Sequence, residues 1–484
     1  MTGYLLLTGS TGLLGRYLMR DLLESGQRLA LLVRGSKRES ASHRVEAILQ
    51  FWERETGRIL PRPVLLEGDL RKPCLGLSGN DKRWVADHCS SIMHSAASLT
   101  FHADGSGEPW LTNFDGTRNM LELCEATGLR KLHYVSTAYV CGLRPGTMLE
   151  SEVDCGQTFR NDYEESKLKA EMLVRSADFI DELTVYRPAV ISGDSKTGYT
   201  NTYHGIYLYL RLMALLIPRQ PIGPDGVRIT NLRIPIIGDE RRNVVPVDWV
   251  SKAMTHLYLT PEAHGHTFNL APDVCMTARE MIDAGVTYFN SSGVDYVGYV
   301  TIDPSTYNEL EAASLPGLAM YNNYENTDPK FDCTNLKRFA SHLPCPPIDE
   351  TVLHTYIRYG EEDRWGKRRI EAPVIPWVAA DYFREFQVAD DISYGATKSR
   401  VAIDLIGPGG GQWTLGLLED GTLTCTAGIH ADADSVLRIN VSEFRKLVAT
   451  TKNSKTQHAV EQLFPMSTAV SLEPHAQSNR ERVF

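Results

Sequence analysis

The chain has 484 residues, of which 42% are hydrophobic and 23% charged, so it is long and apolar enough for two or three folding units rather than one. Its formal net charge of −10, with Lys and Arg scattered among Asp and Glu, excludes a surface built to neutralise nucleic-acid phosphates. The nine cysteines stand singly, without Cys-x-x-Cys or His at metal-ligand spacing, which predicts reduced thiols, a cytoplasmic location and no metal site.

Residues 4–187 alternate short runs rich in Val, Leu, Ile and Tyr with longer amphipathic segments, a pattern typical of a parallel sheet with crossover helices. The predicted strands are 4–8, 29–33, 64–67, 91–94, 131–136 and 183–187. The predicted helices are 13–25, 42–54, 111–127 and 163–177. This order predicts an α/β fold with a doubly wound parallel sheet of the Rossmann type.

Neither of two apolar runs qualifies as a targeting or membrane segment. The run at 4–7 is too short for a signal peptide and predicts a strand. The run at 206–217 is interrupted by Arg211 and falls short of the roughly 20 residues that cross a bilayer. We therefore expect no transmembrane segment.

A glycine loop joins the first strand to the first helix. In the segment Thr8-Gly9-Ser10-Thr11-Gly12-Leu13-Leu14-Gly15, the first glycine permits a tight turn, the second lets the backbone approach a pyrophosphate, and the third lets helix and strand pack closely. The start of the following helix supplies aligned N–H groups to the anion. A glycine-rich turn without a ligand is the alternative, and the order of strand, loop and helix favours a dinucleotide.

The end of the second strand distinguishes NAD from NADP. An Asp or Glu there would accept hydrogen bonds from a ribose 2′-hydroxyl, whereas this chain has Arg34, followed by Ser36 and Lys37. A guanidinium suits a phosphate dianion, so the prediction is NADPH, with a solvated basic turn as the alternative. Asp69 and Leu70, after the third strand, are expected near the adenine.

Tyr163 and Lys167 stand four residues apart, hence on one face of the helix predicted for 163–177. A nearby fixed cation favours the phenolate and lowers the phenol pKa from its usual value of about 10. Such a phenol is a competent proton donor to a carbonyl that takes up hydride. By itself this spacing is also common on surface helices, but Ser136 and Thr137 add hydroxyls at the carboxyl edge of the sheet, where ligands bind in this architecture.

Residues 194–245 and 262–365 are irregular and rich in Gly, Pro and Tyr, and we expect them to form a lobe over the cofactor that selects the substrate. Arg233, Arg241 and Arg242 of this lobe either contact pantetheine or nucleotide phosphates or form a solvated face.

A charged run followed by two prolines predicts a linker near 366–377. Residues 378–465 then show alternating apolar positions and a final helix, which predicts a small α+β domain, and residues 466–484 form a polar tail.

Taken together, the motifs of residues 1–370 resemble those of the extended short-chain dehydrogenase/reductases, and within that group the thioester-reductase and fatty acyl-CoA reductase branch. The matching motifs are the glycine loop at 8–15, Gly-Asp-Leu at 68–70, His-Ser-Ala-Ala at 94–97, Asn-Phe-Asp-Gly-Thr at 113–117, Val-Ser-Thr-Ala-Tyr-Val at 135–140, Tyr-x-x-x-Lys at 163–167, Tyr-Arg-Pro at 186–188, Asn-Val-Val-Pro-Val-Asp at 243–248 and Phe-Asp at 331–332. Residues 378–465 resemble a sterol-carrier-protein-2-like domain, which typically encloses a lipid tunnel. A scaffolding or dimerising role for this domain is the alternative.

The resemblance implies that Thr137, Tyr163 and Lys167 are catalytic, that Lys167 also binds the nicotinamide ribose, and that Asn113 holds the active-site backbone. Ser136 is a neighbouring candidate for the hydroxyl role. The full set of predicted cofactor contacts is Thr8, Gly9, Ser10, Thr11, Gly12, Leu13, Leu14, Gly15, Arg34, Ser36, Lys37, Asp69, Leu70, Ser95, Ala96, Ala97, Asn113, Ser136, Tyr163, Lys167, Arg187 and Pro188.

The activity predicted from these motifs is NADPH-dependent reduction of an acyl thioester, on coenzyme A or an acyl carrier protein, to an aldehyde; further reduction to the alcohol is left open. Ala138 and Tyr139 stand where sugar dehydratases of this kind carry Asp-Glu, which counts against a dehydratase. Fold and triad do not settle the substrate, so a nucleotide-sugar epimerase using NAD(P) and a hydroxysteroid or alcohol dehydrogenase remain alternatives. A lipid-binding cofactor sensor is the non-enzyme alternative, and a homodimer is left open.

Overall fold

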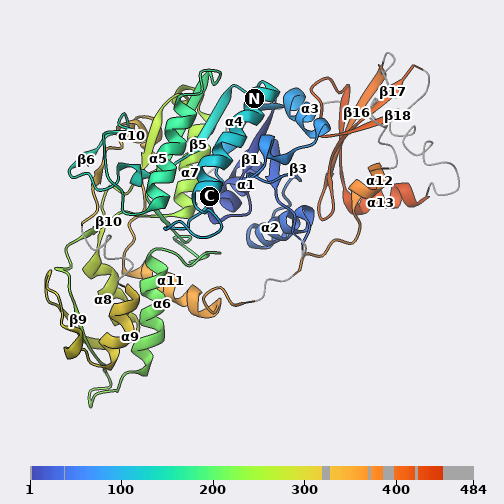
Figure 1. Ribbon diagram of the computed structural model, residues 1–484. Coiled ribbons are helices and arrows are strands. Elements are labelled where there is room, and N and C mark those ends of the chain that lie inside the picture. Colours follow the sequence, from blue (N-terminus) through green and yellow to red (C-terminus); the bar gives the residue numbers. More distant parts are fainter. Residues whose placement is uncertain are drawn as a thin grey trace. The chain divides into compact units, whose positions relative to one another are not determined.

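The computed structural model describes residues 3–36, 39–318, 327–368, 372–384, 397–419 and 423–450 (Figure 1). The chain divides into two compact units, the first comprising Met1–Ile48 and Leu65–Ala372 and the second Leu49–Val64 and Pro373–Phe484. The division after Ala372 falls inside the range predicted for a linker. No helix within the described ranges is long and apolar enough to cross a bilayer.

A seven-stranded sheet forms the centre of the first unit, in the order β12-β7-β5-β4-β1-β2-β3. Its strands are β1 (Tyr4–Thr8), β2 (Leu29–Val33), β3 (Val64–Glu67), β4 (Cys89–His94), β5 (Lys131–Val135), β7 (Glu182–Pro188) and β12 (Thr267–Leu270). The pairs β1/β2, β1/β4, β4/β5, β5/β7 and β7/β12 are all parallel. The chain order reverses at β1, so the gap between β1 and β4 is the switch point where ligands bind in this fold.

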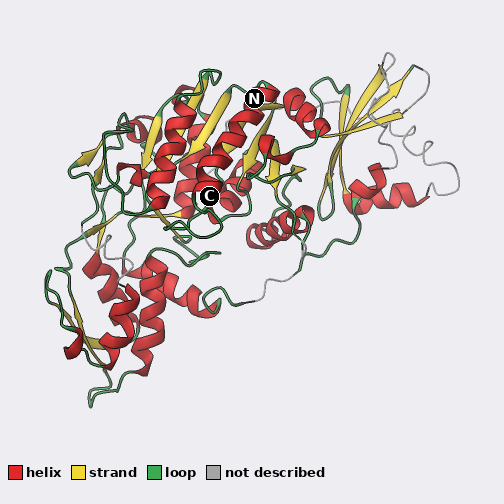
Figure 2. Cartoon of the chain, in the orientation of Figure 1, coloured by secondary structure: helices red, strands yellow, loops and turns green. Residues whose placement is uncertain are grey.

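Helices lie between the successive strands of this sheet along the chain (helices red and strands yellow in Figure 2). They are α1 (Leu13–Glu24), α2 (Ala41–Thr56), α3 (Gly79–His88), α4 (Gly116–Thr127), α5 (Asp162–Arg175) and α7 (Val247–Leu259). Helix α1 packs against α7, whereas α4 packs against both α3 and α5. Right-handed crossovers on either side of β1 put these two groups on opposite faces of the sheet. The predicted doubly wound α/β fold is therefore confirmed.

A smaller lobe of the first unit follows β7. Its elements are β8 (Val190–Ser192), α6 (Ile206–Leu216), β9 (Arg228–Ile234), β10 (Arg241–Arg242), β11 (Val244–Pro246), β13 (Met276–Thr277), α8 (Ala278–Tyr288), β14 (Ser291–Tyr296), α9 (Glu309–Leu318) and α11 (Glu350–Glu362). Strands β8 and β11 pair in parallel, as do β9 and β14. Buried side chains of α6, α8 and α11, among them Leu210, Met281 and Tyr356, form the lobe's core. Three further elements, β6 (Thr147–Met148), β15 (Lys330–Phe331) and α10 (Thr334–Ala340), complete the first unit.

The second unit contains a four-stranded sheet in the order β18-β17-β16-β19. Its elements are α12 (Ala379–Arg384), β16 (Thr397–Ile406), β17 (Gly411–Leu418), β18 (Leu423–Ala427), β19 (Ser435–Asn440) and α13 (Val441–Thr450). Phe383 of α12 stacks on Trp413 of β17 and on Phe444 of α13, so both helices cover one face of the sheet. The part of the predicted α+β domain after residue 450, and the tail at 466–484, lie outside the described residues.

One predicted helix differs in a way that matters for the site. The segment predicted as a helix over 111–127 begins as a π-helical turn, η2 (Leu111–Asp115), and continues as α4. Single π turns of this kind re-aim side chains and occur often at functional sites. Asn113 lies in this turn.

Candidate active site

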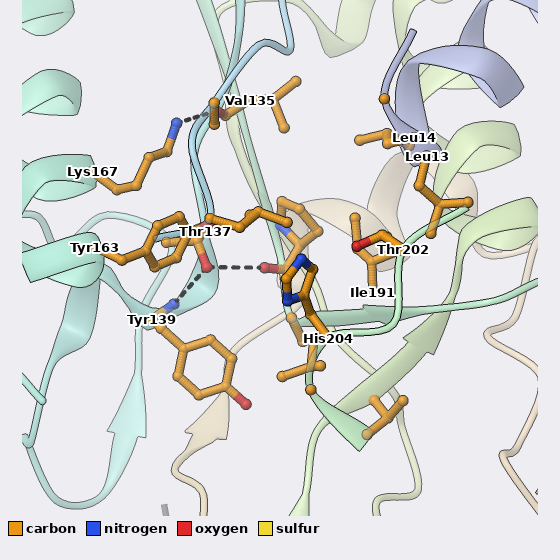
Figure 3. Close-up of a pocket in the computed structure, with 18 of the residues that line it drawn as sticks. Leu13, Leu14, Val135, Thr137, Tyr139, Tyr163, Lys167, Ile191, Thr202 and His204 are labelled. Carbon is orange, nitrogen blue, oxygen red and sulfur yellow. Dashed lines mark hydrogen bonds between the residues drawn. The ribbon is translucent and has the colours of Figure 1, made fainter. Parts of the chain in front are cut away.

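One cavity of about 480 Å³ opens at the carboxyl edge of the large sheet. Among its lining residues are the ones that directly follow four strands, namely Gly9 after β1, Ser95 after β4, Ser136 after β5 and Ala189 after β7. Thr137, Tyr163 and Lys167 line the same cavity as the glycine loop (Figure 3). The fold thus brings together segments that are far apart in the chain.

The glycine loop can pack closely against the segment after β4 and against itself only because of its glycines. Gly9 has φ +76°, and a Cβ there would lie 2.7 Å from the backbone nitrogen of Ala96. A Cβ on Gly15 would lie 2.0 Å from the carbonyl oxygen of Gly9. The Ser10 hydroxyl is buried in this loop and has no hydrogen-bond partner among the described residues. A close-packed loop with an unsatisfied hydroxyl fits a pyrophosphate at the start of α1.

Tyr163 stands in the first turn of α5, which Asn161 caps by accepting a hydrogen bond from the Glu164 N–H. Burial raises the pKa of the Tyr163 phenol to about 12, the Glu164 carboxylate adds to the rise, and a hydrogen bond with Thr137 opposes it. The prediction that a neighbouring ammonium makes this phenol more acidic is therefore wrong for this structure. The phenol is protonated at neutral pH.

Lys167 explains that difference, because its ammonium turns toward the sheet. Its Nζ donates to the Val135 carbonyl oxygen at 2.8 Å and to the Tyr134 hydroxyl at 3.3 Å, and lies 4.7 Å from the centre of the Tyr134 ring (Figure 3). A spacing of four residues puts two side chains on one helix face, but it does not bring the Lys167 ammonium into contact with the Tyr163 phenol. Burial lowers the pKa of Lys167 to about 8, with Glu171 opposing the fall.

Thr137 is held by the backbone on two sides. Its hydroxyl accepts a hydrogen bond from the Tyr139 N–H at 3.3 Å and donates one to the carbonyl of Pro188, the last residue of β7, at 3.4 Å. These bonds point the Thr137 oxygen at the cavity beside Tyr163 (Figure 3). The Tyr139 hydroxyl, in turn, donates to Asp328 at 2.9 Å.

Asn113 connects three parts of the site. Its Oδ1 accepts from the Ser98 N–H at 2.8 Å, and its Nδ2 donates to the Ser98 carbonyl at 3.2 Å and to the Ser166 hydroxyl at 3.0 Å. The side chain is buried and therefore ties the loop after β4 to α5, next to Tyr163 and Lys167. This geometry suits the backbone-holding role that the resemblance implies.

Two arginine residues, Arg34 after β2 and Arg44 in α2, lie near Thr11 of the glycine loop. Arg34 is largely exposed and approaches Asp69 at 3.9 Å, while Arg71 holds the pKa of the Asp69 carboxyl below its usual value. Sequence reasoning missed Arg44 in α2, whose guanidinium donates to the Arg34 carbonyl at 2.7 Å and to the Thr11 hydroxyl at 3.2 Å. Lys37 lies outside the described residues, and Ser36 bonds back to Glu39.

Some of the other predicted cofactor contacts line the cavity, and others hold the neighbouring backbone in place. Leu13, Leu14, Ala97 and Pro188 line the cavity. Thr8 is buried, and its hydroxyl contacts His94 and the N–H groups of Ser95 and Ala96, so it joins β1 to β4. The Leu70 carbonyl accepts from the Asn119 side chain at 2.7 Å.

Arg187 was predicted as a cofactor contact, and the structure gives its side chain a different position. The guanidinium is buried in an ion pair with Glu171 of α5, with Nε 3.1 Å from Oε2, and it is not part of the cavity lining. A buried carboxylate on α5 needs such a partner, because an unpaired buried charge is strongly destabilising. Arg187 therefore joins β7 to α5.

Two residues that line the cavity belong to no sequence motif and could not be predicted as site residues. Thr202 and His204 lie in the irregular segment before α6, and both line the cavity opposite Tyr163 (Figure 3). Buried Glu164 also lines it and forms an ion pair with Arg160 at 3.3 Å. Among the described residues, no group of three or more His, Cys, Asp or Glu side chains could hold a metal ion.

The sheet order, the glycine loop and the hydroxyl and ammonium groups around one cavity define an NAD(P)-binding oxidoreductase of the extended short-chain dehydrogenase/reductase type. The chain belongs to the male sterility protein family, whose NAD-binding domain matches residues 7–254.

Part of the chain is similar to longer curated proteins. The chain is 26% identical to the nonribosomal peptide synthetase hkm10 of Aspergillus hancockii and 28% identical to the aldehyde reductase lnaA of Aspergillus flavus, in each case over 397 residues, 74% of this chain and 36% of the relative. The chain thus spans about a third of the length of these curated relatives. Its fold is similar to that of the terminal R domain of the myxalamid PKS-NRPS biosynthetic pathway, with a TM-score of 0.59 and 24% identity over 76% of this chain and 92% of that one.

Proposed function

We propose that the chain uses NADPH to reduce an acyl thioester, carried on coenzyme A or an acyl carrier protein, to an aldehyde. The observation that carries the proposal is the single cavity in which Tyr163, Thr137 and Lys167 adjoin the glycine loop. The similarity to an aldehyde reductase and to a peptide synthetase favours a thioester over the nucleotide sugars or steroids of the alternative functions.

NADPH, when bound along the glycine loop, supplies hydride to the carbonyl carbon of the thioester. The residues of the chain bind and protonate the carbonyl oxygen of the thioester. The Tyr163 phenol donates a hydrogen bond and then its proton to that oxygen, while the fixed Thr137 hydroxyl bonds to the phenol and holds it in place. The product is a hemithioacetal. Its hydroxyl loses the proton, the carbonyl forms again, and the carbon–sulfur bond breaks to give the aldehyde and a thiol.

The raised pKa of Tyr163 suits the reductive direction. A proton donor must be protonated at the start of the step, and a phenol with a pKa of about 12 is protonated throughout the neutral range. We assign the Lys167 ammonium, which is bonded to the Val135 carbonyl at the end of β5, to the nicotinamide ribose of the bound cofactor.

We assign the 2′-phosphate of NADPH to Arg34 and Arg44. The Arg44→Ala variant should raise the KM for NADPH about tenfold or more and leave the KM for NADH nearly unchanged, because a hydrogen bond to a charged group contributes about 1.5–3 kcal/mol. Arg54→Ala, on the exposed last turn of the same helix, is the matched control and should change neither constant. An equal loss with both cofactors would contradict this assignment.

The test of the activity itself is a panel of acyl-CoA esters of graded chain length, with NADPH oxidation followed by absorbance and aldehyde captured by a hydrazine. We expect NADPH consumption matched by aldehyde or alcohol formation and by release of free thiol. Activity on a nucleotide sugar or a sterol, with no NADPH consumed for any ester, would refute the proposal.

For the second unit, we retain the proposal of a sterol-carrier-protein-2-like module that holds lipid or joins two copies of the chain. The packed core of Phe383, Trp413 and Phe444 supports an independently folded module. Titration of the full chain with a fluorescent fatty acid, together with its mass in solution, separates the two roles. The cytoplasmic location predicted from the dispersed cysteines remains part of the proposal.

A further inference from the structure

A second cavity, of about 650 Å³, lies inside the lobe between α6, β9, α8 and α9. These elements gather at one end of the first unit (Figure 1). Apolar side chains such as Met213, Ile234, Met281, Val286 and Val294 line most of this cavity. Protein interiors hold few voids larger than a water molecule, so a cavity of this size is in the range of a ligand site rather than a packing defect.

Three of the six hydroxyl-bearing residues that line this cavity bond to other groups of the protein. Thr230 bonds to the Ser291 hydroxyl, Ser314 donates to the Leu310 carbonyl at 2.8 Å, and Tyr299 bonds to Glu240. A wall made mostly of apolar side chains offers little to a polar ligand, whereas it stabilises apolar groups by removing them from water.

Two residues connect this cavity to the candidate active site. Tyr209, in the first turn of α6 and partly buried against the core of the lobe, and Arg242 of β10 line both cavities. The two cavities therefore adjoin at these side chains. A long molecule that begins beside Tyr163 would have to pass between Tyr209 and Arg242 to enter the apolar cavity. The Arg242 guanidinium disfavours a cationic group at this passage.

We propose that the second cavity binds the apolar tail of the acyl group whose thioester lies beside Tyr163. This inference rests on the proposed thioester reduction and adds the substrate class, a long uncharged aliphatic or aryl acyl chain. Each methylene that enters the cavity contributes about 0.8 kcal/mol of burial, which is roughly fourfold in kcat/KM.

The test fills the cavity from one side of α8. Val286 lines it, whereas the next residue, Thr287, has a side chain of nearly the same shape and is exposed outside both cavities. We would measure kcat/KM of Val286→Trp, Thr287→Trp and the unchanged chain with acetyl-, hexanoyl- and dodecanoyl-CoA. For Val286→Trp we expect a loss that grows with chain length and exceeds tenfold for dodecanoyl-CoA, while Thr287→Trp keeps the original profile.

Leu310→Ala enlarges the same cavity from α9 and supports the test if the tryptophan variant does not fold; it should shift the preferred chain length upward. The inference is overturned if the unchanged chain reduces these esters and neither variant alters the dependence on chain length. If the unchanged chain reduces none of these acyl groups, either as coenzyme A esters or loaded on an acyl carrier protein, the proposed function itself fails, and this assignment of the cavity fails with it.

Discussion

Replacing Tyr163 by Phe should lower kcat for thioester reduction by about 10²–10⁴-fold, the range that a positioned general acid contributes. The ring of Phe keeps the packing of the half-buried tyrosine against Phe101, whose centroid lies 6.4 Å away. The only group lost is the hydroxyl that meets Thr137 and faces the cavity. The measurement is single-turnover NADPH oxidation with a saturating acyl-CoA ester.

Two readouts separate this loss of chemistry from a loss of structure. The Kd for NADPH and the melting temperature should stay close to those of the unchanged chain, because the phenol makes no bond that holds α5 or the glycine loop in place. A Tyr163→Phe variant that retains activity within a factor of three would show that another group protonates the oxygen, and His204, which faces the same cavity, would be the first to examine.

The strands that carry the site could be predicted because each is a short, buried, apolar run bounded by turn residues. Other elements lacked that signal. Helix α3 buries only Val85 and so has no apolar stripe, although Ser78 and Asp81 form a capping box that marks its start. Helix α7 is buried on most sides, which removes the periodicity of an amphipathic helix. Strand β12 has four residues of which only Phe268 and Leu270 are apolar, a weaker apolar run than that of β3, and such a segment is hard to distinguish from a loop.

Within the site, sequence patterns predicted which backbone segments meet, but they did not predict which groups the long side chains contact. The glycine loop and Asn113 follow from local motifs, and the structure places both where the fold class requires. Arg44 was missed because its approach to Thr11 depends on how α2 packs, 33 residues along the chain. The pKa of Tyr163 was predicted in the wrong direction because burial and Glu164 outweigh a lysine whose ammonium is bonded to Val135.

The rate of reduction should fall as pH rises through about 8. Lys167 carries its positive charge below its lowered pKa of about 8 and loses it above that value, whereas Tyr163, with a pKa of about 12, keeps its proton. The high-pH limb of the profile therefore reports the loss of the ammonium that holds the nicotinamide ribose in position. In Lys167→Met we expect kcat to be lower by about 10²-fold and this limb to be absent.

The lowered pKa of Lys167 also predicts how the stability of the fold depends on pH, and this dependence tests whether the lysine has a catalytic or a structural role. Because the pKa of Lys167 is lower in the folded chain than its usual value of 10.5, the unfolded chain binds more protons between pH 8 and 10.5, and the free energy of unfolding rises with pH over that window. The buried ammonium thus weakens the fold at neutral pH, so Lys167→Met should unfold at the same temperature as the unchanged chain or a higher one. Denaturant unfolding measured at several pH values checks this. A variant that is both inactive and markedly less stable at neutral pH would mean that the bonds to Val135 and Tyr134 are what this lysine chiefly supplies.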